Sequence, residues 1–303
     1  MPDLSEFVAF VSEKSGIRKP SLIERDVLIH RILRGINSAF GNAYLFKGGS
    51  CLVKCYFGYY RFSVDLDFTW REQKAWKNLG KKGLRRELVA QAEKFGSVLE
   101  STAHDMELDF RCDLKNRNYV EFGSGSRMAT FKLWMGGELI KIQVNFVERL
   151  IFPHRNVTAK TLLAGRKIQD DEKAYFEEFM EFYHPVKVAA YSLEEILCEK
   201  IRAILTRQAM KLRDIYDVFM IEKAGVRMEE LREEILAKIG VAMRFKKYRE
   251  ALMASINTLD LENVLDDPSE MQMFVIKPTE EFYSFVGELE NFLKDVAREV
   301  SKK

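Results

Sequence analysis

The chain has 303 residues and a mass of 35.3 kDa, a length that predicts one large or two modest domains. Apolar residues make up 47% and charged residues 31% of the sequence, which excludes a disordered chain and predicts a sizeable core. The 48 basic and 46 acidic residues leave a formal net charge of +2, so net charge alone does not indicate a nucleic-acid-binding protein.

The sequence lacks the marks of a membrane or secreted protein. No run of 18 uncharged apolar residues is present, and the start, MPDLSEFVAF, lacks the pattern of a signal peptide. The spacing of the four cysteines matches neither a zinc site nor a disulfide framework (Cys51, Cys55, Cys112 and Cys198). We therefore expect a cytoplasmic protein in a reducing environment.

The first part of the chain changes from a helical pattern to a mixed one. Residues 4–40 are predicted to be helical, since apolar positions recur at helical spacing after Ser21. Residues 42–68 then predict an apolar strand (AYLF), a glycine turn (KGGS), a short helical stretch (CLVKCYF), a loop, and a second strand with a period of two (VDLDFTW).

The rest of the chain is predicted to be mainly helical, apart from one hairpin. Residues 71–97 are helical and carry a local charge of +5, and residues 128–147 form a hairpin that turns at Gly136-Gly137. Residues 168–183 form a loop or a short helix. From Ser192, which begins a capping-box sequence, the pattern is helical to the end. A soft domain boundary is predicted at 185–192.

The clearest chemical motif joins a glycine turn to two carboxylates. Gly48-Gly49-Ser50 opens a short helix, whose backbone N–H groups can approach phosphates, and Asp65-Leu66-Asp67 follows on the next strand. Alternation places Asp65 and Asp67 on one face, roughly 6.5–7 Å apart, which suits Mg²⁺ or Mn²⁺ bound together with phosphate oxygens. Each part alone has a plainer interpretation, namely a solvated strand face and an ordinary turn.

Taken together, these residues resemble a known family. The order of these motifs is similar to the signature of DNA polymerase β-like nucleotidyltransferases. It consists of an apolar strand, then Gly-Gly-Ser, then Asp-Leu-Asp-Phe. The longer strings FKGGSCLVK and RFSVDLDF resemble the AbiEii toxin family in particular. Further similarities, which extend over about residues 20–220, are Ile23–Asp26 (IERD), Lys141–Phe146 (KIQVNF), Leu193–Lys200 through Arg207, and Arg213–Asp217 (RDIYD).

One departure concerns the metal site. The family pattern leads us to expect a third carboxylate at the strand position that Gln143 occupies, and glutamine carries no charge. Glu148, five residues further on, is predicted to lie past the strand and to face the opposite side. The site is thus expected to hold its metal with Asp65 and Asp67 as the only protein carboxylates.

A second candidate group lies in the helical region after residue 192. Lys200 falls in the middle of the apolar stripe of its helix, so it must either snorkel to solvent or bind a buried anion. A structural salt bridge is one interpretation. The other, which the resemblance favours, is that Lys200 reaches nucleotide phosphates or the active-site carboxylates, with Arg207 at the edge of the same pocket. Asp214 matches the family's functional acid, and Asp217 is expected to be a supporting group.

Other candidates have two open interpretations. The Ser63 hydroxyl either binds a phosphate or a metal-bound water, or caps the strand. Arg61 either neutralises phosphate or pairs with an acid, and Lys54 lies one helical turn from Ser50, near the expected phosphates. The basic segment 71–97, with Trp70 and Trp76, either presents a solvated helix face or holds the backbone of a polynucleotide. A weaker basic cluster follows at Arg244, Lys246, Lys247 and Arg249.

The resemblance implies an α/β (α+β) fold, with a nucleotidyltransferase-type mixed sheet, flanking helices and a helical C-terminal domain. The expected domains are N-terminal helices over 1–40, a core over 41–188 and a helical domain over 189–303, with the active site in the cleft between the last two.

The implied reaction transfers a nucleoside monophosphate from an NTP to a hydroxyl, with tRNA as the first acceptor to test. The implied roles are metal binding by Asp65 and Asp67, phosphate binding by Gly48, Gly49 and Ser50, and charge compensation by Lys200, positioned by Asp214. The resemblance further implies the toxin of a toxin–antitoxin pair, whose antitoxin is a transcription regulator. A nucleotide-binding module without catalysis and a plain RNA-binding protein are the alternatives.

Overall fold

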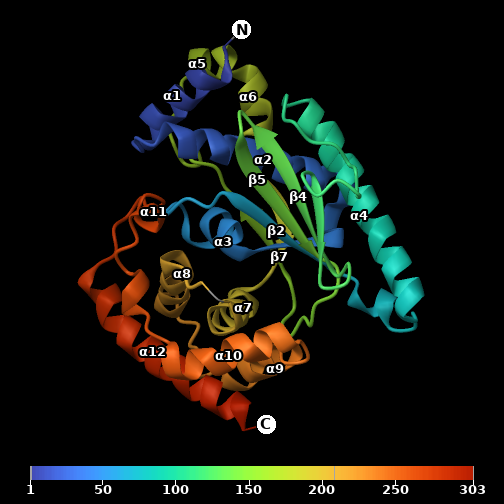
Figure 1. Ribbon diagram of the computed structural model, residues 1–303. Coiled ribbons are helices and arrows are strands. Elements are labelled where there is room, and N and C mark those ends of the chain that lie inside the picture. The colour runs from blue at the N-terminus through green and yellow to red at the C-terminus, as the bar shows by residue number, and fades with distance from the viewer. Residues whose placement is uncertain (1, 208, 303) are drawn as a thin grey trace. The chain divides into compact units, whose positions relative to one another are not determined.

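A computed structural model describes residues 2–207 and 209–302 of the chain (Figure 1). Contacts divide these residues into two compact units. The first contains residues up to 148 together with 154–190, and the second contains 149–153 together with the residues from 191 onward. The expected α/β fold is confirmed, with a seven-stranded mixed sheet in the first unit and helices in the second.

The first unit begins with two helices, α1 (Leu4–Ser15) and α2 (Pro20–Phe40). The Asp3 carboxylate caps α1 by accepting from the Glu6 N–H, and Gly16 ends the helix in a left-handed conformation. Proline at the first position of α2 begins the second helix, because its missing N–H would have no helical partner there.

The sheet has the strand order β3-β4-β5-β2-β1-β7-β6. Its members are β1 (Tyr44–Lys47), β2 (Asp65–Trp70), β3 (Val120–Gly123), β4 (Met128–Met135), β5 (Glu138–Asn145), β6 (Arg155–Ala159) and β7 (Val186–Ala190). The central strand β2 runs antiparallel to β1 and parallel to β5. The predicted hairpin at Gly136-Gly137 is confirmed as the β4–β5 turn, where both glycines have positive φ angles.

Short helical segments and one long helix connect the strands. They are η1 (Gly41–Ala43), α3 (Gly48–Cys51), the π-helical η2 (Leu52–Phe57), η3 (Gln73–Trp76), α4 (Lys81–His104), α5 (Asp170–Tyr175) and α6 (Glu177–Phe182). The predicted glycine turn is itself the first turn of α3, which runs on into η2.

One face of the sheet forms the core of the first unit. Phe46, Phe68 and Phe131 point to this face, where Phe95 of α4 packs with ring centroids 6.0 Å from Phe68 and 5.2 Å from Phe131. Helices α2 and α4 pack against each other and cover this face (Figure 1). Because residues alternate along a strand, β2 presents Asp65 and Asp67 on the opposite face.

The second unit is helical. It contains α7 (Leu193–Thr206), α8 (Leu212–Lys223), α9 (Arg232–Ala242), α10 (Lys246–Thr258), η4 (Glu262–Val264), α11 (Pro268–Met271) and α12 (Glu280–Ser301). The amphipathic α12 buries one stripe against α7, α8, α9 and α10. Within the described ranges, no helix has both the length and the apolar character that crossing a membrane requires.

The capping box predicted at the start of α7 is only half formed. Ser192 Oγ accepts from the Glu195 N–H over 3.3 Å, as predicted. The Glu195 carboxylate instead accepts from the N–H groups of Ile151 and Phe152 and pairs with the buried Lys238. These bonds explain why residues 149–153, which interrupt the first unit in sequence, belong to the second.

Candidate nucleotide site

The two carboxylates of the D-x-D motif share one face of β2. Asp65 and Asp67 are half-buried, whereas Leu66 and Phe68 between and after them are buried in the core. In register with Asp67 stand Lys47 on β1 and Gln143 on β5. Lys47 directly precedes the glycine motif, and its place beside Asp67 follows only from the antiparallel pairing of β1 with β2.

The glycine motif lies directly against these carboxylates. Gly48 has a φ angle of +74°, and a Cβ atom added to it would come within 2.6 Å of Asp67 Oδ2. The Ser50 hydroxyl donates to the backbone carbonyl of Asp65. A residue larger than glycine at position 48 would therefore meet both backbone strain and the Asp67 carboxylate.

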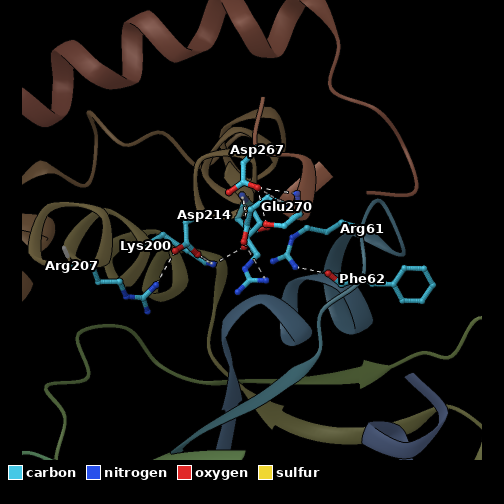
Figure 2. A network of polar contacts seen from close by, with 10 residues as sticks. Arg61, Phe62, Lys200, Arg207, Asp214, Asp267 and Glu270 are labelled. Atoms are coloured by element: carbon cyan, nitrogen blue, oxygen red, sulfur yellow. Dashed lines mark hydrogen bonds and ion pairs between the residues drawn. The ribbon is translucent and has the colours of Figure 1, made fainter. Parts of the chain in front are cut away.

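Gly49 has a second pair of polar neighbours. A Cβ atom at Gly49 would clash with Arg61 Nη2 and lie 3.2 Å from Ser63 Oγ. The Arg61 side chain is only 1% exposed, and its Nη1 donates to the carbonyl of Phe62 over 2.8 Å (Figure 2). The structure thus gathers a guanidinium, a hydroxyl and the motif's backbone within contact distance, a combination that suits phosphate oxygens.

Lys54 has a different place from the one predicted. Its ammonium is buried and lies 2.6 Å from Asp26 Oδ1 and 2.9 Å from the Tyr59 hydroxyl. Since these groups already enclose the charge, the assignment of Lys54 to the nucleotide phosphates is corrected. Its position one turn after Ser50 suggested a phosphate contact, but the side chain extends toward α2.

The structure also revises the expectation for Glu148. Its Oε2 lies 3.4 Å from Asn145 Nδ2. Asn145 is two residues from Gln143 on β5, so both side chains point to the same face of the strand. Glu148 therefore lies beside the carboxylate-bearing face, and the prediction that it faces the opposite side is wrong. The residues after β5 bend back, and strand alternation does not apply to them.

Two protein carboxylates fit a magnesium ion that completes its coordination with substrate phosphates and water. Gln143 donates from Nε2 to Thr130 Oγ1 over 3.1 Å, which leaves its amide oxygen as the group available on that side chain. In the described part of the chain, no group of three or more His, Cys, Asp or Glu side chains is arranged to hold a metal. Asp65 and Asp67 are the carboxylates of this site that could take part in such coordination.

In the second unit, Lys200 lies between two acids. Its Nζ is 2.5 Å from Asp214 Oδ1 (Figure 2). The same Nζ is 2.6 Å from Asp217 Oδ2, and Asp217 is fully buried. Arg207 Nη1 donates to the other oxygen of Asp214 over 2.8 Å. Lys200 thus has the buried anions that its place in the apolar stripe of α7 requires, and Asp217, which was expected to be a supporting group, is one of them.

The first part of the basic segment 71–97, residues 71–86, carries exposed basic side chains. Seven basic side chains and one acid lie between residues 71 and 86, and those seven are exposed (Arg71, Lys74, Lys77, Lys81, Lys82, Arg85 and Arg86). Trp76 Nε1 donates to the Phe146 carbonyl over 2.7 Å, and Trp70 packs beside it with ring centroids 6.1 Å apart. The two indoles anchor η3 to the ends of β2 and β5.

The predicted site residues thus form two clusters. Gly48, Gly49, Ser50, Ser63, Asp65 and Asp67 come together in the first unit, and Lys200, Arg207 and Asp214 come together in the second. The predicted cleft between the two domains stays a prediction.

Comparison with known proteins agrees with this geometry. A search of curated proteins gives no match. A family described as "Nucleotidyl transferase AbiEii toxin, Type IV TA system" matches residues 31–292, a range that includes both clusters. The chain therefore belongs to the AbiEii family of nucleotidyltransferase toxins of type IV toxin–antitoxin systems.

Proposed function

We propose that the protein transfers a nucleoside monophosphate from an NTP to a hydroxyl of RNA, with the 3′ end of tRNA as the acceptor. The observation that carries this proposal is the contact between the glycine motif and Asp67, which joins a phosphate-binding backbone to a pair of carboxylates. Family membership supports nucleotidyl transfer in general.

In the proposed reaction, the acceptor oxygen forms a bond to the α-phosphorus while the bond to the β-phosphate oxygen breaks. Pyrophosphate leaves, and the proton of the acceptor hydroxyl passes to solvent or to the pyrophosphate. Backbone N–H groups of Gly48, Gly49 and Ser50 bind the β- and γ-phosphates, and Arg61 and Ser63 lie where they can add donors. These groups hold the leaving pyrophosphate in place.

Asp65 and Asp67 are the residues that would hold Mg²⁺ or Mn²⁺. When bound, the metal offsets negative charge on the phosphates and on the attacking oxygen. The two half-buried carboxylates on one strand face are suited to this role, because without a cation they repel each other.

Lys200 is proposed to compensate charge on the triphosphate, with Arg207 beside it. Asp214 holds the Lys200 ammonium in place through the 2.5 Å ion pair. An ammonium that is already oriented loses less rotamer entropy when it binds an anion. The charges of Lys200 and Arg207 are balanced by those of Asp214 and Asp217.

RNA is proposed as the acceptor because of the exposed basic segment 71–86. It carries a net charge of +6, whereas the whole chain carries +2, so positive charge is concentrated there. Its first residue lies four positions after Asp67, about 13 Å along β2. RNA bound to this segment would lie on the same unit as Asp65 and Asp67. We propose that the reaction takes place in the cytoplasm.

The partner implied by the family is a cognate antitoxin, which we propose to be a transcription regulator. Toxicity of the chain when its antitoxin is absent follows from the same proposal.

The test uses the purified chain with Mg²⁺, each α-labelled NTP in turn, and total tRNA. The wild type should label RNA with one preferred NTP, and Asp65→Asn should not. Label on the protein would retain the chemistry and change the acceptor.

One observation favours an alternative, namely a nucleotide-binding module without catalysis. Gln143 stands in register with Asp67 and carries no charge, so the site lacks a third carboxylate on β5. NTP binding without transfer to RNA or protein would support this alternative. Salt-sensitive RNA binding without any need for NTP or metal would indicate a plain RNA-binding protein.

A further inference from the structure

A buried ion pair connects helix α2 to the helical run that begins with the glycine motif. The Lys54 ammonium lies 2.6 Å from the Asp26 carboxylate, and both side chains are at most 3% exposed. The Tyr59 hydroxyl accepts from Lys54 and donates to Asp26 over 2.9 Å, and the Tyr183 hydroxyl donates to Asp26 over 2.6 Å. We call these four residues the Asp26 cluster.

The hydrogen bonding of the Asp26 cluster is well matched to its burial. Burial and the nearby Asp26 charge raise the pKa values of Tyr59 and Tyr183 well above the usual range, so both phenols stay protonated donors. Asp26 thus receives one ammonium and two hydroxyl groups. Such a network defines a single arrangement, because shifting any one donor leaves a buried charge incompletely bonded.

Two of the three donors belong to the segment that builds the candidate site. Lys54 follows Ser50 by four residues in the same helical run, and Tyr59 lies in the loop that leads to Asp65. The backbone of Lys54 is held as well, since its carbonyl accepts from the Lys160 N–H over 2.8 Å. The chain between the glycine motif and the carboxylates is therefore tied to Asp26 at two points.

The site leaves little room for that segment to move. Gly48 lies against Asp67, and Gly49 lies against Arg61 and Ser63, in both cases too closely for a Cβ atom. Binding sites require their groups to be held within about 0.5 Å of the productive geometry. The π-helical turn Leu52–Phe57 carries Lys54, and such turns are concentrated at functional sites.

Stability alone does not account for a buried pair of this kind. An apolar pair of similar volume is often as stable or more stable, because burying charges carries a desolvation penalty. The charged pair adds geometric specificity. A hydrogen-bonded ammonium and carboxylate 2.6 Å apart restrict the position of the Lys54 helical turn relative to α2 more narrowly than an apolar contact does.

We propose that Asp26 is a positioning residue: through Lys54 and Tyr59 it holds the glycine motif and the loop to Asp65 in the geometry that binds the NTP. This inference rests on the proposed nucleotidyl transfer. Asp26 itself touches neither the substrate nor the two site carboxylates in this scheme.

The first test separates position from stability. Lys54→Met should lower both the melting temperature and activity, because it leaves Asp26 buried without its cation. In the double variant Asp26→Leu/Lys54→Met the charges are removed together, so the melting temperature should rise above that of Lys54→Met, and it should stay below that of the wild type because the Tyr59 and Tyr183 hydroxyls lose Asp26 as their acceptor. Its kcat/KM for the NTP should stay about 10- to 100-fold lower. Recovery of both quantities would overturn the proposal.

The second test uses a matched pair of variants. Tyr59→Phe and Tyr183→Phe each remove one hydroxyl that donates to Asp26, and only Tyr59 lies between the glycine motif and Asp65. We expect similar losses of melting temperature, but a KM for the NTP that rises about tenfold in Tyr59→Phe alone. Equal KM values in the two variants would contradict the inference.

A readout without activity separates this inference from the proposed function. Hydrogen exchange of the backbone amides of residues 48–64 should be faster in Tyr59→Phe and in the double variant than in Tyr183→Phe. Unchanged exchange would overturn the positioning role even in an active enzyme. A wild type that neither binds nor transfers any NTP would instead overturn the proposed function, and the exchange comparison would still decide whether Asp26 orders this segment.

Discussion

Asp67 on β2 and Gln143 on β5 are register partners on adjacent parallel strands, so an uncharged amide stands beside a site carboxylate. Side chains of such partners point to the same face, and the Gln143 amide is oriented by its bond to Thr130. This position offers the most direct way to vary the charge of the site.

Gln143→Glu should strengthen metal binding. A third carboxylate beside Asp67 raises repulsion in the metal-free protein, so its melting temperature should fall without metal and rise more steeply on addition of Mn²⁺ or Mg²⁺. Thermal unfolding across a metal titration measures this change. Gln143→Met, which has similar size and no charge, should show no added metal response.

Gly48→Ala should abolish NTP binding, and this loss should be larger than its loss of thermal stability explains. Alanine at a φ of +74° costs about 1 kcal/mol, and its Cβ would also push against the Asp67 carboxylate. Gly58→Ala is the matched control, because Gly58 has a φ of +76° with open space around its Cα. Both variants should lose stability in thermal unfolding through the positive φ angle, Gly48→Ala should lose more because of the Asp67 contact, and Gly48→Ala alone should lose NTP binding. Equal NTP affinity in the two variants would argue against a nucleotide at this motif.

The two acids around Lys200 should have separable roles. Asp217→Asn should lower stability by about 1–3 kcal/mol, because it weakens a fully buried pair, and activity should stay within a few-fold of the wild type. Asp214→Asn should reduce kcat/KM about 100-fold, since it loosens both Lys200 and Arg207. Steady-state kinetics with thermal unfolding of both variants test this difference. The opposite order of activities would make Asp217 the functional acid.

The basic segment 71–86 should bind the RNA acceptor. Alanine at Lys81, Lys82, Arg85 and Arg86 should raise the KM for RNA at least tenfold and leave the KM for the NTP unchanged. Each lost phosphate contact should also reduce the slope of log K against log salt by about 0.7–0.9. Alanine at Arg244, Lys246, Lys247 and Arg249 removes the same charge from the second unit and serves as the control. Equal effects of the two variants would indicate a non-specific charge effect.

His30 should make the protein less stable in acid. Burial, followed by the charge of Lys54, lowers the pKa of His30 to about 3, below its usual value of 6.5. Between pH 6.5 and 3 the unfolded state therefore binds a proton that the folded state does not, so this contribution to stability falls as the pH falls. The slope is up to about 1.4 kcal/mol per pH unit.

His30→Gln should flatten the fall in melting temperature between pH 7 and pH 5. His104→Gln, at a histidine whose side chain is 91% exposed, should leave that fall unchanged. An identical pH profile for His30→Gln and the wild type would mean that His30 does not titrate as its burial implies.

The sequence by itself determined the strand–glycine–helix–strand unit, the hairpin at Gly136-Gly137 and the helical second half. These features depend on local rules, namely a period of two, a period of 3.6 and glycine at positive φ, which neighbouring residues express without distant partners. The shared face of Asp65 and Asp67 follows from the same alternation. The need of Lys200 for a buried anion follows from its place in an apolar stripe.

Only the tertiary structure decided which distant groups meet. Lys54 has the same sequence spacing whether it faces a phosphate or Asp26, and the packing of α2 selects Asp26. Glu148 lies beyond the end of β5, where the chain bends and alternation no longer predicts its side, and its contact with Asn145 decides it. Arg61 and Ser63 meet Gly49 because the loop folds back over the helix. Contacts of this kind depend on chain reversals and on the pairing of strands far apart in sequence, and local propensity carries no information about either.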